Sequence, residues 1–211
     1  DILGTSSLEI SAFLSPYIAN PQTVLTVKMF DDMMIQQENN IKKNFGDKII
    51  FNDANIDFSA KGIHLLYGES GSGKTTLLNI LLGIDKNFIG EYICDGKSIK
   101  NNEIEEFRKN KIGYMAQGQG IIPQFTVEEN IHLFKKINND MDQKLKEFKI
   151  FDLKNNKASK ISGGQAQRVA IIRALYQEKE IIILDEPTNN LDKNNIKILL
   201  ELLNEIKSEV T

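Results

Sequence analysis

The residues Gly68–Thr75 read Gly-Glu-Ser-Gly-Ser-Gly-Lys-Thr and fit the pattern G-x-x-x-x-G-K-[ST]. In such a loop the glycines let backbone N–H groups turn inward around a phosphate. The ammonium group of Lys74 can reach β- and γ-phosphate oxygens, and the hydroxyl group of Thr75 can ligate Mg²⁺. We therefore expect the chain to bind a nucleoside triphosphate. The expected phosphate-binding residues are Gly68, Glu69, Ser70, Gly71, Ser72, Gly73, Lys74, Thr75 and Thr76.

A phosphate-binding loop of this kind needs a strand before it and a helix after it. Ile63–Tyr67 is a short apolar run, which is typical of a strand buried on both faces. From Thr75 to Leu82 the leucines recur at helical spacing, and Gly83 is a suitable residue for the helix to end. The N-terminus of that helix would direct its partial positive charge at the phosphates.

A second candidate site follows another apolar run. Ile181–Leu184 is uniformly apolar and predicts a central parallel strand, and Asp185 and Glu186 come directly after it. At the phosphate edge of a sheet, the carboxylate of Asp185 can hold Mg²⁺ through water. The carboxylate of Glu186 is placed to accept a proton from an attacking water, a role that contributes about 10²–10⁴-fold to a rate.

The run Ile161–Arg168 reads Ile-Ser-Gly-Gly-Gln-Ala-Gln-Arg and precedes a predicted helix through Ala174. Ser162 is a good N-cap residue, and the amide groups at the start of a helix can bind a phosphate. With the phosphate loop before it and Asp185-Glu186 after it, this run resembles the Leu-Ser-Gly-Gly-Gln signature of the nucleotide-binding subunits of ABC transporters. Isoleucine stands here in place of the signature's leucine.

This resemblance, which covers residues 34–211, implies an α/β fold. The expected architecture is a P-loop NTPase core with a mostly parallel sheet, an antiparallel β subdomain and a small helical subdomain at about residues 118–160. The resemblance also implies ATP and Mg²⁺ as ligands, and a head-to-tail dimer in which a second copy of the ATPase domain completes each ATP site. Hydrolysis would power translocation by partner transmembrane permease subunits. The signature residues expected to contact the ATP of the opposite copy are Ser162, Gly163, Gly164 and Gln165.

Three further positions match the family. Gln117, which fits the spacing after Ile112–Ala116 better than Gln119 does, resembles the glutamine that contacts Mg²⁺ or the attacking water. Phe45 resembles the aromatic residue that stacks on adenine, a contact of about 1–3 kcal/mol, although a role in the core is the alternative. Asp192 resembles the residue that links the two sites across the dimer. The expected catalytic residues are Glu186, Gln117 and Lys74, and the expected metal ligands are Thr75, Gln117 and Asp185.

The bulk composition limits the class of protein. A chain of 211 residues with 41% hydrophobic and 26% charged residues is typical of a soluble globular domain. The net charge of −3 offers no electrostatic basis for nucleic-acid binding. The single cysteine, Cys94, excludes an internal disulfide. No apolar run approaches the ~18 residues of a membrane span, and no signal peptide is visible, so we expect a cytoplasmic protein, peripheral at the inner face of the cell membrane.

Residues 1–33 contain no motif, and we interpret them as an N-terminal extension or linker, with an added strand at Thr23–Phe30 as the alternative. Residues 34–211 are expected to form one nucleotide-binding domain. Its further predicted strands are Ile49–Phe51 and Ile56–Phe58 around a turn at Asn52-Asp53, a hairpin over Glu91–Ile99, and Ile112–Met115. Its further predicted helices are one opened by a capping box at Thr126–Glu129 and running through Phe134, and a late one that buries Ile196, Leu199, Leu200, Leu203 and Ile206.

The family pattern also includes a histidine that contacts the γ-phosphate. By spacing it would fall a few residues beyond Thr211, and neither His64 nor His132 matches its position. We therefore expect a domain that lacks its last strand and this histidine. Two alternatives to a transport ATPase follow: a soluble ABC ATPase, and a nucleotide-binding regulator with little turnover. The short interval between Gln117 and Ser162 leaves no room for the long coiled coil of chromosome-type members.

Overall fold

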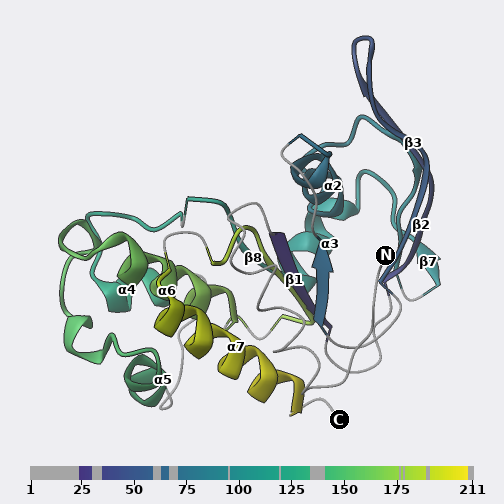
Figure 1. Cartoon of the computed structure of the whole chain (residues 1–211). Helices are drawn as coiled ribbons and strands as arrows, with labels where there is room; N and C mark the ends of the chain where they lie inside the picture. Colours follow the sequence, from purple (N-terminus) through teal and green to yellow (C-terminus); the bar gives the residue numbers. More distant parts are fainter. Residues whose placement is uncertain are drawn as a thin grey trace.

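The computed structural model describes residues 24–29, 35–58, 63–66, 71–94, 96–118, 120–133, 141–175, 177, 179–188 and 191–208. In this part of the chain a central sheet stands between a helical part and a long β-hairpin that rises away from it (Figure 1). The central strands therefore lie between a helical region and a β-hairpin.

The central sheet has four strands in the order β4 (Ile63–Leu66), β1 (Val24–Met29), β9 (Ile181–Leu184) and β8 (Ile112–Met115). β8 and β9 pair in parallel, whereas β1 pairs antiparallel with both β4 and β9. β4, β9 and β8 therefore share one direction, and β1 runs against them. All residues of β9 are buried, as expected for a central strand.

β1 lies within Thr23–Phe30, where the sequence analysis gave a strand as the alternative to a linker. Val27 lies opposite His64 on one side and opposite Ile183 on the other, so the strand is paired along both edges. Valine and threonine, which recur in this segment, are residues that favour an extended backbone. Part of the segment interpreted as an extension or linker thus belongs to the sheet that carries the candidate site.

A second sheet is built on a long hairpin. β2 (Ile35–Phe45) and β3 (Lys48–Phe58) pair antiparallel across a turn at residues 46–47, and β5 (Ile89–Glu91) pairs with the other edge of β2. The turn requires a left-handed residue, and Gly46 supplies it with φ 59°.

The turn predicted at Asn52-Asp53 is wrong, because β3 continues through it as one strand. The chain forms a bulge there instead. Ile41 lies opposite Ala54, but Lys43 lies opposite Phe51, so β3 contains an extra residue between these pairs. Asp53 has φ 60°, a left-handed conformation that aspartate tolerates better than most residues. Asn52 and Asp53, which the sequence analysis placed in a turn, therefore lie in a β-bulge.

The predicted hairpin over Glu91–Ile99 is present in shorter form. β6 (Ile93–Cys94) pairs antiparallel with β7 (Lys97–Ser98), and Gly96 has φ 70° in the turn, whereas Asp95 lies outside the described residues. Glu91 does not belong to this hairpin, because it ends β5 and lies opposite Asn39 of β2.

Four of the described α-helices lie where the sequence predicts a helix, whereas those at Ile104–Lys111 and Met141–Glu147 were not predicted. The helix expected through Phe134 ends earlier, at Ile131, and Phe134 lies outside the described residues. The α-helices are α2 (Lys74–Leu81), α3 (Ile104–Lys111), α4 (Val127–Ile131), α5 (Met141–Glu147), α6 (Gly163–Leu175) and α7 (Lys193–Ser208). Two 3₁₀ turns, η1 (Phe151–Leu153) and η2 (Ala158–Lys160), lead from α5 towards α6.

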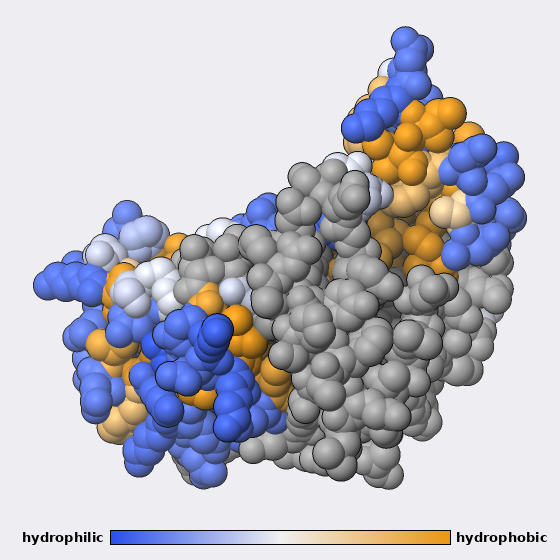
Figure 2. All heavy atoms as spheres, in the orientation of Figure 1, coloured by the Kyte–Doolittle hydropathy of each residue, from blue (hydrophilic) through white to orange (hydrophobic). Residues whose placement is uncertain are grey.

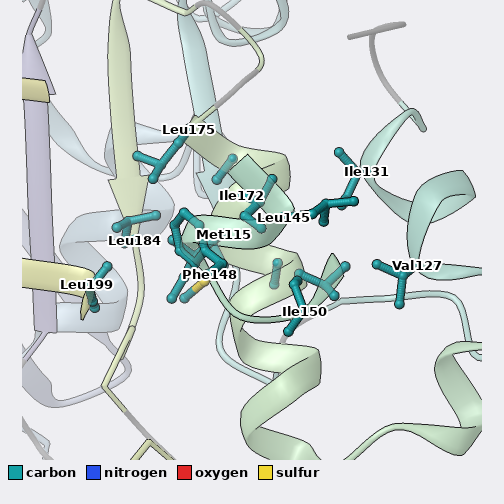
Figure 3. Close-up of a cluster of buried hydrophobic side chains, with 14 of the residues drawn as sticks. Met115, Val127, Ile131, Leu145, Phe148, Ile150, Ile172, Leu175, Leu184 and Leu199 are labelled. Carbon is teal, nitrogen blue, oxygen red and sulfur yellow. The ribbon is translucent and has the colours of Figure 1, made fainter. Parts of the chain in front are cut away.

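Two hydrophobic clusters hold these elements together. One gathers α2 with residues of β2, β6, α3 and β9, and includes Leu78, Tyr92 and Ile183. The other surrounds α6, as Figure 3 shows, with Met115 and Leu184 from the central sheet packed near Phe148 and Ile172. Each fully buried side chain of this size contributes about 1.5–3 kcal/mol. The central strands therefore contribute to both clusters and join the two halves.

The segment that leads into α4 is tied down by local hydrogen bonds. Thr126 Oγ1 accepts from the backbone N–H of Glu129 at 3.1 Å, and Glu129 Oε2 accepts from the N–H of Thr126 at 2.7 Å, which confirms the predicted capping box. The buried amide of Asn130 accepts from Ile122 N at 2.7 Å and donates to the carbonyl oxygens of Ile122 and Thr126.

Candidate functional site: a phosphate loop beside acidic strand ends

The described part of the phosphate loop consists of Gly71, Ser72 and Gly73, while Gly68, Glu69 and Ser70 lie outside the described residues. Gly71 and Gly73 have φ values of 80° and 97°, which only glycine adopts readily. Space also requires glycine at position 73, because a Cβ atom there would lie 2.8 Å from Ile50 Cγ2. The glycines of the loop are thus explained by positive φ angles at positions 71 and 73 and by the close packing of Gly73 against β3.

α2 begins directly at the end of this loop, as predicted. Its first residue is Lys74, whose Nζ donates to Ser72 Oγ at 3.4 Å, and Thr75 is exposed. Thr76 is half-buried, and the leucines beyond it pack into the first hydrophobic cluster. The helix ends where expected, with Gly83 at φ 63°. Thr75 is therefore open to solvent near the start of the helix, while the leucines that follow anchor the helix in the core.

Asp185 lies at the carboxyl end of β9 and is only 5% exposed. Burial and the negative charge of Glu186 raise the pKa of Asp185 to about 6, while the backbone N–H of Gln117 and the positive charge of Lys74 act against this rise. The side chain of Gln117 also contacts Glu186, the next residue, and Lys74 lies near enough to Asp185 for its charge to act on that carboxyl group. The predicted residues Lys74, Gln117, Asp185 and Glu186 are thus brought together.

Glu186 is held in a conformation that its sequence neighbours alone do not favour. Its φ of 49° is left-handed, which is costly for a residue other than glycine, by about 1–3 kcal/mol. Two side chains hold it there. Gln117 Nε2 donates to Glu186 Oε2 at 2.8 Å, and Gln167 Nε2 donates to the carbonyl oxygen of Glu186 at 3.2 Å. Strain of this kind, maintained by surrounding contacts, is characteristic of functional sites.

The signature residues begin α6. The backbone N–H of Ser162 donates to Gln165 Oε1 at 2.8 Å, and Ser162 Oγ accepts from the N–H of Gln165 at 3.3 Å, so Ser162 caps the helix as predicted. Gly163 is exposed, and a Cβ atom built on it would meet nothing within 4 Å. In Figure 1 the helical part that contains α6 lies apart from α2.

The two other predicted site residues, Asp192 and Phe45, lie at the ends of their elements. Asp192 caps α7, because its Oδ1 accepts from the backbone N–H of Asn195 at 2.9 Å. Phe45 ends β2 and is 55% exposed, and Ile49 nearby on β3 is 67% exposed. Figure 2 shows hydrophobic side chains gathered on the arm that β2 and β3 form. The exposure of Phe45 argues against the alternative that it belongs to the core.

Two buried polar residues near the site, Gln167 and Arg173, were not among the predicted site residues. Gln167 is buried in α6 and also donates to the carbonyl oxygen of Pro187 at 3.0 Å, so it holds the backbone after Asp185. Arg173 is buried in the same helix and donates through Nη1 to the carbonyl oxygen of Gly120 at 2.9 Å, in the loop after Gln117. Polar residues on an otherwise buried helix were the available signal, because such groups persist only when they are hydrogen-bonded.

The geometry suits phosphate chemistry at one edge of the sheet. Among the described residues there is no group of three or more histidine, cysteine, aspartate or glutamate side chains that could hold a metal ion by itself. Across the part of the chain that the structure describes, no helix is both long and apolar enough to cross a bilayer.

A phosphate loop at a helix N-terminus, together with two carboxylates at the end of a buried strand of the same sheet, defines a P-loop nucleotide hydrolase. Comparison with known proteins narrows the class. Residues 51–189 match the family model described as ABC transporter. The lipoprotein-releasing system ATP-binding protein LolD of Leptospira interrogans is 35% identical over 80% of this chain and 76% of its own. The ergothioneine transport ATP-binding protein EgtV of Helicobacter pylori is 35% identical over 79% of this chain and 81% of its own.

A solved structure agrees with these relatives. The ATP-binding cassette MJ0796, determined as a dimer in a post-hydrolysis state with ADP and Pi, superposes with a TM-score of 0.63. It is 28% identical in sequence, and the match covers 88% of this chain and 83% of that chain. The chain belongs to the ABC transporter family. As a member of this family it is an ATPase, whose hydrolysis of ATP powers transport by partner membrane subunits.

Proposed function

We propose that the strand-end site, made of Lys74, Gln117, Asp185 and Glu186, hydrolyses ATP held on the phosphate loop. The observation that carries this proposal is the convergence of these four side chains from three separate elements, with Gln117 Nε2 2.8 Å from Glu186 Oε2. Residues 68–76 cradle the phosphates, and Lys74 neutralises charge on the β- and γ-oxygens. The exposed ring of Phe45 stacks on the adenine.

In the proposed reaction, Glu186 accepts a proton from water as the water oxygen bonds to the γ-phosphorus atom. The bond between the γ-phosphorus and the bridging oxygen breaks, which leaves ADP and inorganic phosphate. Gln117 orients the carboxylate of Glu186 and the attacking water. The buried backbone contacts of Gln167 keep Glu186 in the orientation that proton transfer requires.

Mg²⁺ fits the donor set at the same edge. Asp185 offers a carboxylate, Thr75 an exposed hydroxyl group and Gln117 an amide oxygen, all of them hard oxygen ligands. When bound, Mg²⁺ would offset the negative charge of the phosphate oxygens and allow Asp185 to be ionised despite its burial. The rise in the pKa of Asp185 to about 6 supports this role, because a nearby cation is what an ionised carboxylate needs at that position.

A second copy of the chain completes the site in this proposal. Ser162, Gly163, Gly164 and Gln165 lie at the start of α6, whose amide groups are suited to a phosphate, and Figure 1 shows α6 apart from α2 of the same chain. A head-to-tail dimer would bring them to the γ-phosphate on the partner copy, and Asp192 would lie near the junction of the two sites. The dimeric state of the solved relative supports this arrangement.

We further propose the subdomain division expected from the sequence, with an antiparallel β part formed by β2, β3 and β5 and a helical part at about residues 118–160. The transmembrane permease subunits would bind the protein at the inner face of the cell membrane. Relatives of equal identity carry names for lipoprotein release and for ergothioneine transport. We therefore assign the choice of cargo to the partner subunits.

The decisive experiment uses the purified chain with Mg²⁺ and ATP. Glu186→Gln is expected to keep ATP binding and to accumulate an ATP-bound dimer, measured by size-exclusion chromatography with light scattering. Lys74→Ala is expected to lose tight ATP binding in isothermal titration, because the phosphate charge loses its partner. A Glu186→Gln protein that stays monomeric at saturating ATP, or a Lys74→Ala protein with unchanged affinity, would contradict the proposal.

A further inference from the structure

β2 carries a charged side chain in a buried setting. Lys43 is only 4% exposed, and its Nζ lies 2.7 Å from Asp85 Oδ2 and donates to the carbonyl oxygen of Asn87 at 2.6 Å. Lysine is rarely buried unless it is paired in this way. Asp85 and Asn87 follow α2, so Lys43 fastens the β2–β3 hairpin to the end of the helix whose start is the phosphate loop.

The carboxylate partner is adapted to this contact. Burial raises the pKa of Asp85, but the hydrogen bond from Lys43, the backbone N–H of Asn87 and the positive charge of Lys43 outweigh burial and leave this pKa below 3.8. Asp85 is therefore ionised at neutral pH, and the pair persists there.

The same ammonium group lies against the aromatic ring at the end of β2. Lys43 Nζ is 4.6 Å from the centroid of the Phe45 ring, within the range of a cation–π contact. Residues two apart on a strand project from the same face, so the contact follows from the strand itself. Lys43 covers one face of the ring, while Phe45 as a whole remains 55% exposed.

The strand opposite links this ring to the phosphate loop. Lys43 lies opposite Phe51 in β3, and a Cβ atom built at Gly73 would lie 3.1 Å from Phe51 Cζ. The exposed ring, the buried ion pair and the phosphate loop therefore belong to one packed unit. A shift of the hairpin would change the distance between the ring and the phosphates, which a bound nucleotide must span.

We propose that Lys43 is a positioning residue for the nucleotide base: its buried ammonium group supports one face of Phe45 and locks the hairpin, so that the other face is held at a set distance from the phosphate loop. This inference rests on the proposed function, in which Phe45 stacks on adenine. Lys43 itself need not touch ATP. It acts by limiting the motion of the ring before binding, so less ordering remains when the base arrives.

The test compares two ligands of the full-length chain, ATP and inorganic tripolyphosphate, by isothermal titration in Mg²⁺. Tripolyphosphate engages the phosphate loop but has no base. Lys43→Met is expected to weaken ATP binding by about three- to tenfold, in the range of a cation–π contact, without changing the affinity for tripolyphosphate. Phe45→Ala is expected to weaken ATP binding by about five- to 150-fold, the loss of one base stack. The double variant Lys43→Met with Phe45→Ala is expected to bind ATP no more weakly than Phe45→Ala alone.

Lys42→Met is the matched control, because Lys42 is the adjacent lysine and makes an exposed ion pair with Asp53. It should leave both affinities unchanged. Lys43→Arg keeps the charge and should largely restore ATP binding. Should Lys43→Met prove too unstable to measure, the double variant Lys43→Met with Asp85→Asn leaves no buried charge unpaired and gives the same comparison.

The possible results separate this inference from the function on which it rests. An equal loss of ATP and tripolyphosphate affinity in Lys43→Met would overturn the inference, as would additive losses in the double variant with Phe45→Ala. Wild-type protein that binds tripolyphosphate as tightly as ATP would overturn the base stack and this inference with it, but not the phosphate site. Wild-type protein that binds neither ligand would overturn the proposed function itself.

Discussion

The strand-end site and the capped segment at residues 122–131 treat polar groups in opposite ways. In the capped segment, the fully buried amide of Asn130 makes three hydrogen bonds to residues close in sequence, and Thr126 and Glu129 satisfy each other. At the strand-end site, two adjacent carboxylates lie together, one of them buried with its pKa raised to about 6 and the other on a left-handed backbone.

The capped segment stabilises the fold, whereas the strand-end site keeps charged groups that can bind a cation or transfer a proton. A satisfied buried amide rigidifies its surroundings and has little left to offer a ligand. Neighbouring carboxylates in a partly buried site are unfavourable without a cation or a proton, so they are suited to bind or transfer one. Substitutions in the capped segment should therefore lower the free energy of unfolding, whereas substitutions at the strand-end site should change ATP turnover or the pH dependence of stability.

The largest effect is expected for Glu186→Gln. Its rate of ATP hydrolysis should fall by about 100- to 10,000-fold, because the amide cannot accept the proton of the attacking water. Phosphate release measured at saturating ATP, with the membrane partners present, checks this value. Glu105→Gln, at an exposed position of α3, is the control and should hydrolyse ATP normally. A Glu186→Gln enzyme with at least a tenth of wild-type turnover would place the base elsewhere.

Asn130→Ala should act on stability. The substitution removes three hydrogen bonds and leaves the backbone groups of Ile122 without these partners, so the free energy of unfolding should fall by about 2–4 kcal/mol. Urea unfolding measures the change, with exposed Asn101→Ala as the control. Equal stability of Asn130→Ala and wild-type protein would show that the hydrogen bonds of Asn130 do not stabilise the fold.

Asp185→Asn should instead raise the stability of the nucleotide-free protein at neutral pH. The pKa of Asp185 is about 6 in the folded protein against an ordinary 3.8, so the folded state binds the extra proton and wild-type stability falls as pH rises between these values. Removal of the charge should add about 3 kcal/mol at pH 7, and almost nothing below pH ~3.8. Thermal unfolding in EDTA at both pH values measures this; a pH-independent difference would refute the explanation.

Thr126→Ala should give the smallest effect. The loss of the cap of α4 is expected to lower the free energy of unfolding by about 1 kcal/mol, because the N–H of Glu129 loses its acceptor. Thr126→Ser keeps the oxygen and should behave like wild type in the same urea unfolding experiment. Turnover should stay unchanged in both variants. A reduced rate with normal stability would show that the capped segment takes part in catalysis.

Local pattern was sufficient for much of the fold. The apolar runs at Ile112–Met115 and Ile181–Leu184 predicted their strands, and the capping box at Thr126 predicted the start of α4. The turn predicted at Asn52-Asp53 failed because polar residues that favour a turn also suit a bulge, and only the pairing partner decides between them. The direction of β1 could not be predicted either, since the apolar pattern of a strand is the same in both directions.

The sequence by itself determined which residues could do the chemistry. The glycine spacing of the phosphate loop, the acidic pair after β9 and the capped start of α6 each depend on neighbours along the chain, so local backbone preferences suffice to indicate them. Only the tertiary structure decided the contacts of Gln167, Arg173 and Lys43, whose partners are distant in sequence. The buried polar groups of those residues acquire meaning only when packing removes water and brings the partners into reach.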